Sequence, residues 1–85
     1  PGVPLVDRLR VRGLDRDAEI AHELLDAALA IEVPRDLHAA VLERLVAHRA
    51  RLGLADGELL EHPEAEEVLR RLLHTILASP AAQVS

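Results

Sequence analysis

The sequence predicts an all-α fold, a small antiparallel bundle of three main helices plus a short N-terminal helix. Apolar residues recur at helical spacing through most of the 85 residues, whereas the alternation typical of a half-buried strand is nearly absent. Proline and glycine residues divide the periodic segments into pieces joined by short links. Short links favour antiparallel packing of successive helices.

The first helix is predicted over residues 4–12. Pro4 suits a first helical turn, because its missing N–H would have no partner there and its φ already matches the helix. Gly13 can end this helix, since glycine adopts the left-handed conformation without strain. The apolar side of the helix holds Leu5, Val6 and Leu9.

The second helix is predicted over residues 16–31. Asp15 or Asp17 is expected to cap its N-terminus by accepting backbone N–H bonds. Pro34 stops the helix, because proline disfavours helical angles at the residue before it. The apolar stripe holds Ile20, Leu24, Ala27, Ala28 and Ile31, and Ala21 and Leu25 widen it.

The third helix is predicted over residues 35–52, with Gly53 as its left-handed C-terminal residue. Asp56-Gly57 then indicates a turn, followed by a single helical turn around residues 58–60. The apolar stripe of this helix holds Leu37, Val41, Leu45, Val46 and Leu52, with Leu42 beside it.

The last helix is predicted over residues 63–78, and Pro80 ends it. Its first turn is rich in glutamate, which the positive end of the helix macrodipole favours. Its apolar stripe is the strongest in the chain and holds Val68, Leu69, Leu72, Leu73, Ile76 and Leu77.

These elements are expected to form one helical segment over residues 1–80, with residues 81–85 as a flexible tail. The chain begins at Pro1 and contains no methionine, so we interpret it as part of a larger protein. With no aromatic residue, the core must be built from aliphatic side chains. We expect that such short stripes do not cover one another completely, and that the uncovered strip is a docking surface.

Composition argues against several functions. The net charge is −5 and no basic stripe is evident, whereas nucleic-acid binding needs clustered cations and often aromatic rings for stacking. The small cluster of Arg8, Arg10 and Arg12 is interpreted as a solvated face. The absence of cysteine excludes disulfides and thiolate metal sites. No apolar run is long enough to cross a bilayer.

One spacing is compatible with a metal site. Glu19 and His22 form a Glu-x-x-His pair, which on a helix supplies a carboxylate and an imidazole in four-helix carboxylate metal proteins. Asp26 lies one turn beyond His22, and Glu43 on the following helix could face them. The site would be completed by a second copy. The competing interpretation is a surface histidine among acidic neighbours, and His74 is expected to be a partly buried structural histidine.

Catalytic chemistry has little support in the sequence. The hydroxyl residues Thr75, Ser79 and Ser85 lack a nearby base and orienting group, and no glycine-rich phosphate loop is present. No catalytic residue is therefore assigned, and neither an enzyme activity nor a cofactor is expected.

The end of the chain resembles a known family. Residues 68–77 form the closing apolar helix, and Ala78-Ser79-Pro80 follow it. This arrangement resembles the C-terminal signature of a bacterial family, domain of unknown function family 1800. Residues 6–9 and the Val33-Pro34 step resemble earlier parts of it, whereas Ala81-Ala82 replace its usual acidic–aromatic pair. The resemblance implies a long, helical and often exported parent protein, and it carries no activity or functional residue.

Two hypotheses follow from the sequence. The first is a non-catalytic structural or protein-interaction module, the C-terminal segment of a larger bacterial protein of unknown function. Its partner would be the remainder of a parent chain or a second copy, with no nucleic acid and no membrane span. The alternative is a metal-binding helical protein whose Glu-x-x-His site is assembled between copies.

Overall fold

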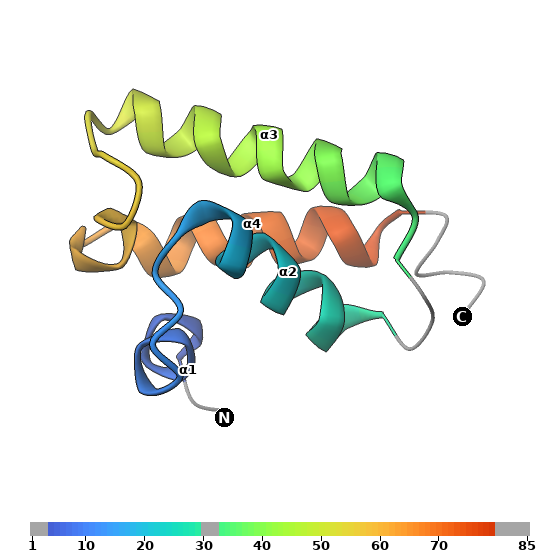
Figure 1. Cartoon of the computed structure of the whole chain (residues 1–85), viewed down its shortest axis with the longest axis horizontal. Coiled ribbons are helices and arrows are strands. Elements are labelled where there is room, and N and C mark those ends of the chain that lie inside the picture. Colours follow the sequence, from blue (N-terminus) through green and yellow to red (C-terminus); the bar gives the residue numbers. More distant parts are fainter. Residues whose placement is uncertain (1–3, 30–32, 80–85) are drawn as a thin grey trace.

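The structure is a computed structural model that describes residues 4–29 and 33–79. Over these residues the chain is all-α, as predicted. It contains α1 (Leu5–Val11), α2 (Asp17–Ala28), α3 (Arg35–Arg51), a short 3₁₀ turn η1 (Leu59–Glu61) and α4 (Ala65–Leu77) (Figure 1). α2 ends before the predicted residue 31, and Ile31 and the predicted tail at 81–85 lie outside the described residues.

α2, α3 and α4 form the predicted antiparallel bundle. α3 and α4 lie side by side in opposite directions, and α2 packs against both (Figure 1). α1 lies at one end of the bundle, against α4. Each helix in the described ranges is too short or too polar to cross a membrane.

The core is aliphatic and draws on every helix. Its members are spaced so that each helix turns one side inward, which is why the apolar periodicity predicts the elements well. The buried apolar residues are Leu9, Ile20, Ala21, Leu24, Leu25, Leu29, Val41, Leu45, Leu59, Leu60, Ala65, Val68, Leu69, Leu72 and Ile76.

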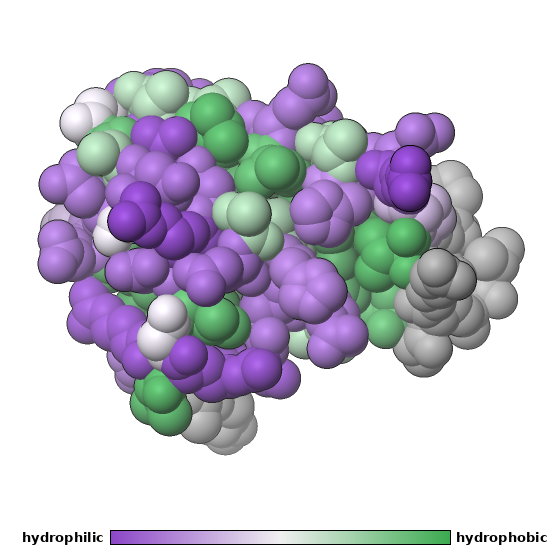
Figure 2. Space-filling model, viewed as in Figure 1, coloured by the Kyte–Doolittle hydropathy of each residue, from purple (hydrophilic) through white to green (hydrophobic). Residues whose placement is uncertain are grey.

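A few large apolar side chains lie at the surface. In the described part of the chain, Val11 is 86% exposed, Leu77 49% and Val46 38%. Val46 and Leu77 belong to the predicted stripes, but they sit at the edges of those stripes, away from the neighbouring helices. Over most of the face in Figure 2, hydrophobic side chains show between hydrophilic ones.

The predicted cap of α2 is wrong. Arg16 is the N-cap residue, and its backbone N–H donates to Oε1 of Glu19 at 3.3 Å. Asp17 is the first helical residue, and its own N–H donates to Oδ1 of Asp56 at 2.8 Å. The cap therefore comes from a loop 39 residues away and not from an adjacent aspartate, because the Asp17 side chain binds Arg49 instead.

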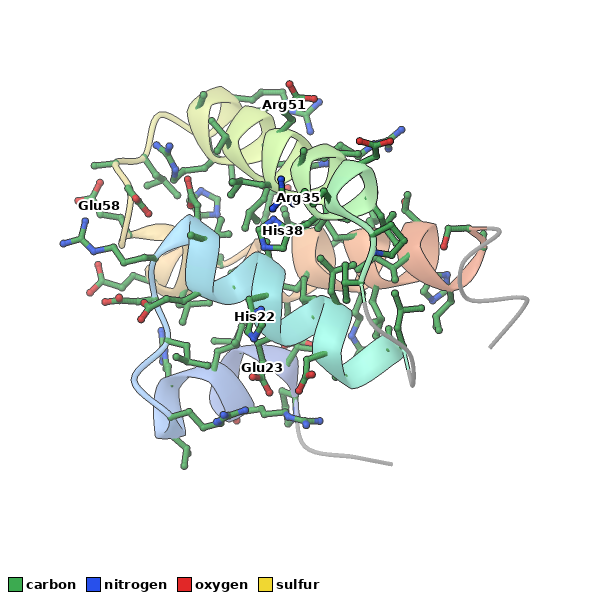
Figure 3. All side chains as sticks on the ribbon, turned by 45° about the vertical axis from the view of Figure 1, so that its right-hand side comes forward. His22, Glu23, Arg35, His38, Arg51 and Glu58 are labelled. Carbon is green, nitrogen blue, oxygen red and sulfur yellow. The ribbon has the colours of Figure 1, made fainter. Side chains whose placement is uncertain are left out.

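The cluster of Arg8, Arg10 and Arg12 is exposed, as predicted, but these side chains also bind α1 and its C-terminal end to the rest of the bundle. Arg12 and Arg8 pair with the buried carboxylate of Glu23, which points from α2 toward α1 (Figure 3). Arg10 donates from Nη2 to the carbonyl of Leu60 at 2.6 Å. These contacts hold a helix whose one buried residue is Leu9.

Candidate binding groove between α3 and α4

α3 places a row of basic side chains along one flank. Val41 and Leu45 turn into the core, which fixes the rotation of the helix. Arg44, His48 and Arg51, at i, i+4 and i+7, then fall in line on the flank toward α4. Arg51 lies on the side of α3 that is away from α2 (Figure 3).

α4 supplies the facing wall with the same spacing. Leu69, Leu72 and Ile76 are buried, so Glu67, Arg71 and His74 line up at i, i+4 and i+7 toward the outside. Between the two walls lies an open groove of about 660 Å³. Its lining residues are Arg44, His48, Glu67, Arg70, Arg71, Leu72, His74 and Thr75, and Arg51 and Ala47 extend it along α3.

Positive charge dominates this groove, although the whole chain carries a net charge of −5. Two of its arginines are paired along α4, Arg70 with Glu66 and Arg71 with Glu67, both at 3.0 Å. Arg44 and Arg51 have no carboxylate partner within residues 4–29 and 33–79. The groove therefore keeps positive charge that its own carboxylates do not neutralise.

His48 lies half-buried in the middle of this charge. Nη2 of Arg51 is 2.6 Å from Nδ1 of His48, and a guanidinium can only donate, so Nδ1 must accept and the ring proton sits on Nε2. Burial lowers the pKa of His48, and the charges of Arg51, Arg71 and Arg44 lower it further. The imidazole is therefore neutral at pH 7.

The groove is suited to binding an anion. Guanidinium groups stay protonated at all physiological pH values, and they present planar pairs of N–H donors that match carboxylate and phosphate oxygens. The hydroxyl of Thr75 is already engaged, because it donates to the carbonyl of Arg71 at 3.0 Å. The groove thus offers fixed charge and hydrogen-bond donors.

The predicted metal residues lie elsewhere. Glu19, His22 and Asp26 are exposed on α2, and Glu43 is exposed on α3. No three potential ligands among histidine, aspartate and glutamate converge on one point in the described parts of the chain. A site shared between two copies remains a prediction.

The sequence contained a signal for the groove that inspection of single helices misses. Basic residues at 44, 48 and 51 and at 71 and 74 have the same spacing on successive helices, and antiparallel packing brings the two rows together. The expectation of a partly buried His74 is wrong, because its ring is exposed beside the groove. In the sequence His74 borders the apolar stripe of α4. In the structure its side chain is exposed and lines the groove.

Comparisons with known protein families, with curated proteins and with solved structures find no match to this chain. The resemblance to domain of unknown function family 1800 therefore remains a prediction, and the interpretation of the groove depends on its geometry and charge.

Proposed function

We propose that this chain is a non-catalytic helical protein-interaction module, and that the groove between α3 and α4 binds an acidic segment of a partner protein. The observation that carries the proposal is the set of arginines that face one another across the groove, Arg44 and Arg51 on α3 and Arg71 on α4, in a chain whose net charge is −5. Positive charge concentrated in a groove attracts and orients a negatively charged partner.

The chemistry of the groove favours binding over catalysis. General acid–base catalysis works best with a group whose pKa lies near the operating pH. Arginine does not release its proton in this range, and the pKa of His48 is lowered by burial and by Arg51, Arg71 and Arg44. The groove supplies donors to an anion without supplying a proton to a reaction.

A protein partner fits better than a nucleic acid. Nucleic-acid grooves combine extended positive charge with aromatic rings for stacking, and this chain has no aromatic residue. Glu67 and Glu64 lie at one end of the groove, near Arg51, and would repel a continuous line of phosphates. A short acidic segment can place its carboxylates beside the arginines and end before these glutamates.

The test is a titration of the isotope-labelled chain with an acidic peptide of alternating glutamate and alanine, followed by nuclear magnetic resonance. Amide signals of residues 44–51 and 67–75 should shift, and the same peptide with glutamine for glutamate should leave them in place. Replacing two arginines, Arg44→Gln with Arg71→Gln, should weaken binding about tenfold, since exposed pairs contribute up to about 1 kcal/mol each.

Arg35→Gln is the matched control. Arg35 is exposed at the start of the same helix and lies outside the groove, so its loss should leave the affinity unchanged. Shifts spread evenly over the chain, or an equal response to the glutamine peptide, would contradict the proposal.

A further inference from the structure

We propose, on the basis of the function above, that the acidic segment recognised by the groove is an α-helix with carboxylates at i, i+4 and i+7. The bound helix would lie along α3 and α4 on the side away from α2. Two features of the walls lead to this inference: their shape and the spacing of their arginines.

The walls have the shape that receives a helix. α3 and α4 are antiparallel and lie side by side, and one helix, α2, already packs against both of them on their other side (Figure 1). Arg49 reaches toward that side, where it binds Asp17, whereas Arg44 and Arg51 lie on the opposite flank. Ala47 lies between these two arginines in the lining, and its small side chain leaves room for a neighbouring backbone.

The spacing of the charges matches a helix laid along the groove. Arg44 and Arg51 are seven residues apart on α3, which corresponds to about 10 Å along its axis. Carboxylates at i and i+7 of a bound helix lie the same distance apart, and a carboxylate at i+4 falls between them, opposite Arg71. An extended segment covers that distance in about three residues, and its side chains alternate between two faces.

Bidentate pairing makes this register matter. The planar guanidinium binds both oxygens of a carboxylate only when the two groups meet in one plane. A helix presents its carboxylates in fixed directions on one face, whereas a flexible acidic chain must lose conformational freedom to do the same. A helical segment in register should therefore bind more tightly than another segment of equal charge.

A second copy of this chain is the competing occupant. Glu19 and Asp26 are exposed on α2 at i and i+7, so α2 of another copy carries part of the proposed pattern. Two copies would associate through this contact without any other protein. Sedimentation of the chain alone separates the two cases, with Asp26→Lys as the variant that reverses one of the two charges of this acidic pair.

The experiment compares three alanine-based peptides of equal length with the same number of glutamates. One carries glutamates at i, i+4 and i+7, one has the glutamates scrambled, and one keeps the register but replaces a central alanine with proline. Fluorescence anisotropy should give a Kd about tenfold lower for the first peptide than for the other two. Arg44→Gln with Arg71→Gln should remove this preference, and Arg35→Gln should keep it.

The outcomes separate the two proposals. Equal affinity for all three peptides would overturn the helical register while leaving the acidic partner in place, and failure of all three to bind would overturn both. A dimer of the isolated chain that Asp26→Lys dissociates would identify the second copy as the occupant and overturn the separate partner. A monomeric chain that prefers the peptide in register supports the inference, and circular dichroism of each variant verifies that the bundle is folded.

Discussion

At the scale of single residues, Asp17 joins three parts of the chain. Its buried carboxylate accepts a hydrogen bond from Nε of Arg49 at 2.7 Å, and Nη1 of Arg49 donates to the carbonyl of Leu54 at 2.8 Å. Its backbone N–H donates to Asp56. The start of α2, the end of α3 and the loop between α3 and η1 are therefore fixed to one another by one ion pair and its hydrogen bonds.

Loss of Arg49 should be costly, because it leaves the Asp17 carboxylate buried and without its charged partner. Oδ1 of Asp17 already has no hydrogen-bond partner among the described residues, so Oδ2 would add a second unpaired atom. We expect Arg49→Met to lower the free energy of unfolding by about 2–4 kcal/mol, measured by urea denaturation.

Two further variants isolate the cause. Arg35→Met removes an exposed arginine from the same helix and should change stability by less than about 0.5 kcal/mol. Adding Asp17→Asn to Arg49→Met should restore part of the lost free energy of unfolding, because the double variant no longer buries an unpaired charge. Equal stability of Arg49→Met and Arg35→Met would show that the ion pair does not stabilise the fold.

At the scale of elements, α1 shows how a helix can depend on its neighbours. It has seven residues, and isolated helices of this length are unstable in water. Its first turn is completed by α4, since the carboxylate of Glu66 accepts hydrogen bonds from the backbone N–H groups of Leu5 at 3.1 Å and Val6 at 2.9 Å. Glu66 thus serves as a cap supplied by a distant part of the chain.

Glu66→Gln should destabilise the docked α1. Glutamine can accept one of the two hydrogen bonds but carries no negative charge, so the expected loss is about 1 kcal/mol in the free energy of unfolding at pH 7. Hydrogen exchange of the α1 amides should speed up more than that of the other helices. Glu67→Gln removes a neighbouring exposed carboxylate that pairs with Arg71, and it should leave α1 unaffected.

The same residue gives stability a pH dependence. Burial raises the pKa of Glu66, but the hydrogen bonds from Val6, Leu5 and Arg70 outweigh it, so the pKa in the folded state is lower than the usual value. A carboxylate with a lowered pKa stabilises the fold above its unfolded pKa, and this contribution is lost as the pH falls through the folded pKa. Wild type and Glu66→Gln should therefore converge in stability in acid; a constant difference at every pH would contradict this.

The helices themselves are predictable from the sequence, whereas their caps are not. Gly13 and Gly53 have φ of 70° and 75°, the left-handed conformation that the sequence predicts for the ends of α1 and α3. These signals are local, and so the boundaries are close. Asp56 and Glu66 satisfy the first turns of α2 and α1 from far along the chain, and no local pattern specifies such partners.

At the scale of the whole molecule, packing decides which apolar residues are buried. Leu69 and Leu77 belong to the same predicted stripe of α4, yet Leu69 is fully buried and Leu77 is 49% exposed. The periodicity identifies the side of a helix that faces the core, but its edges are set by where neighbouring helices lie. The groove has the same origin, because the rows on α3 and α4 become one surface only when the two helices pack.

The groove also predicts a coupling between anion binding and protonation. Arg44 and Arg51 on α3 and Arg71 on α4 surround His48, and Glu67 and Glu64 face it from the other side of the groove. A carboxylate bound to the arginines would offset their charge, so the pKa of His48 should rise in the complex. Binding then takes up a proton, and affinity should increase as the pH falls from neutral toward the pKa of His48.

This coupling can be measured directly at His48. The pH titration of its ring signals is recorded by nuclear magnetic resonance with and without the acidic peptide that carries glutamates at i, i+4 and i+7. It should show a higher pKa of His48 with the peptide bound. His48→Gln should weaken the dependence of affinity on pH while leaving binding at neutral pH nearly intact, since the arginines remain. The backbone amide signals of the exposed residues of α2 should be the same with and without the peptide. If the pKa of His48 is unchanged by the peptide, the anion does not bind among these arginines, because an added negative charge near the imidazole must favour its protonated form.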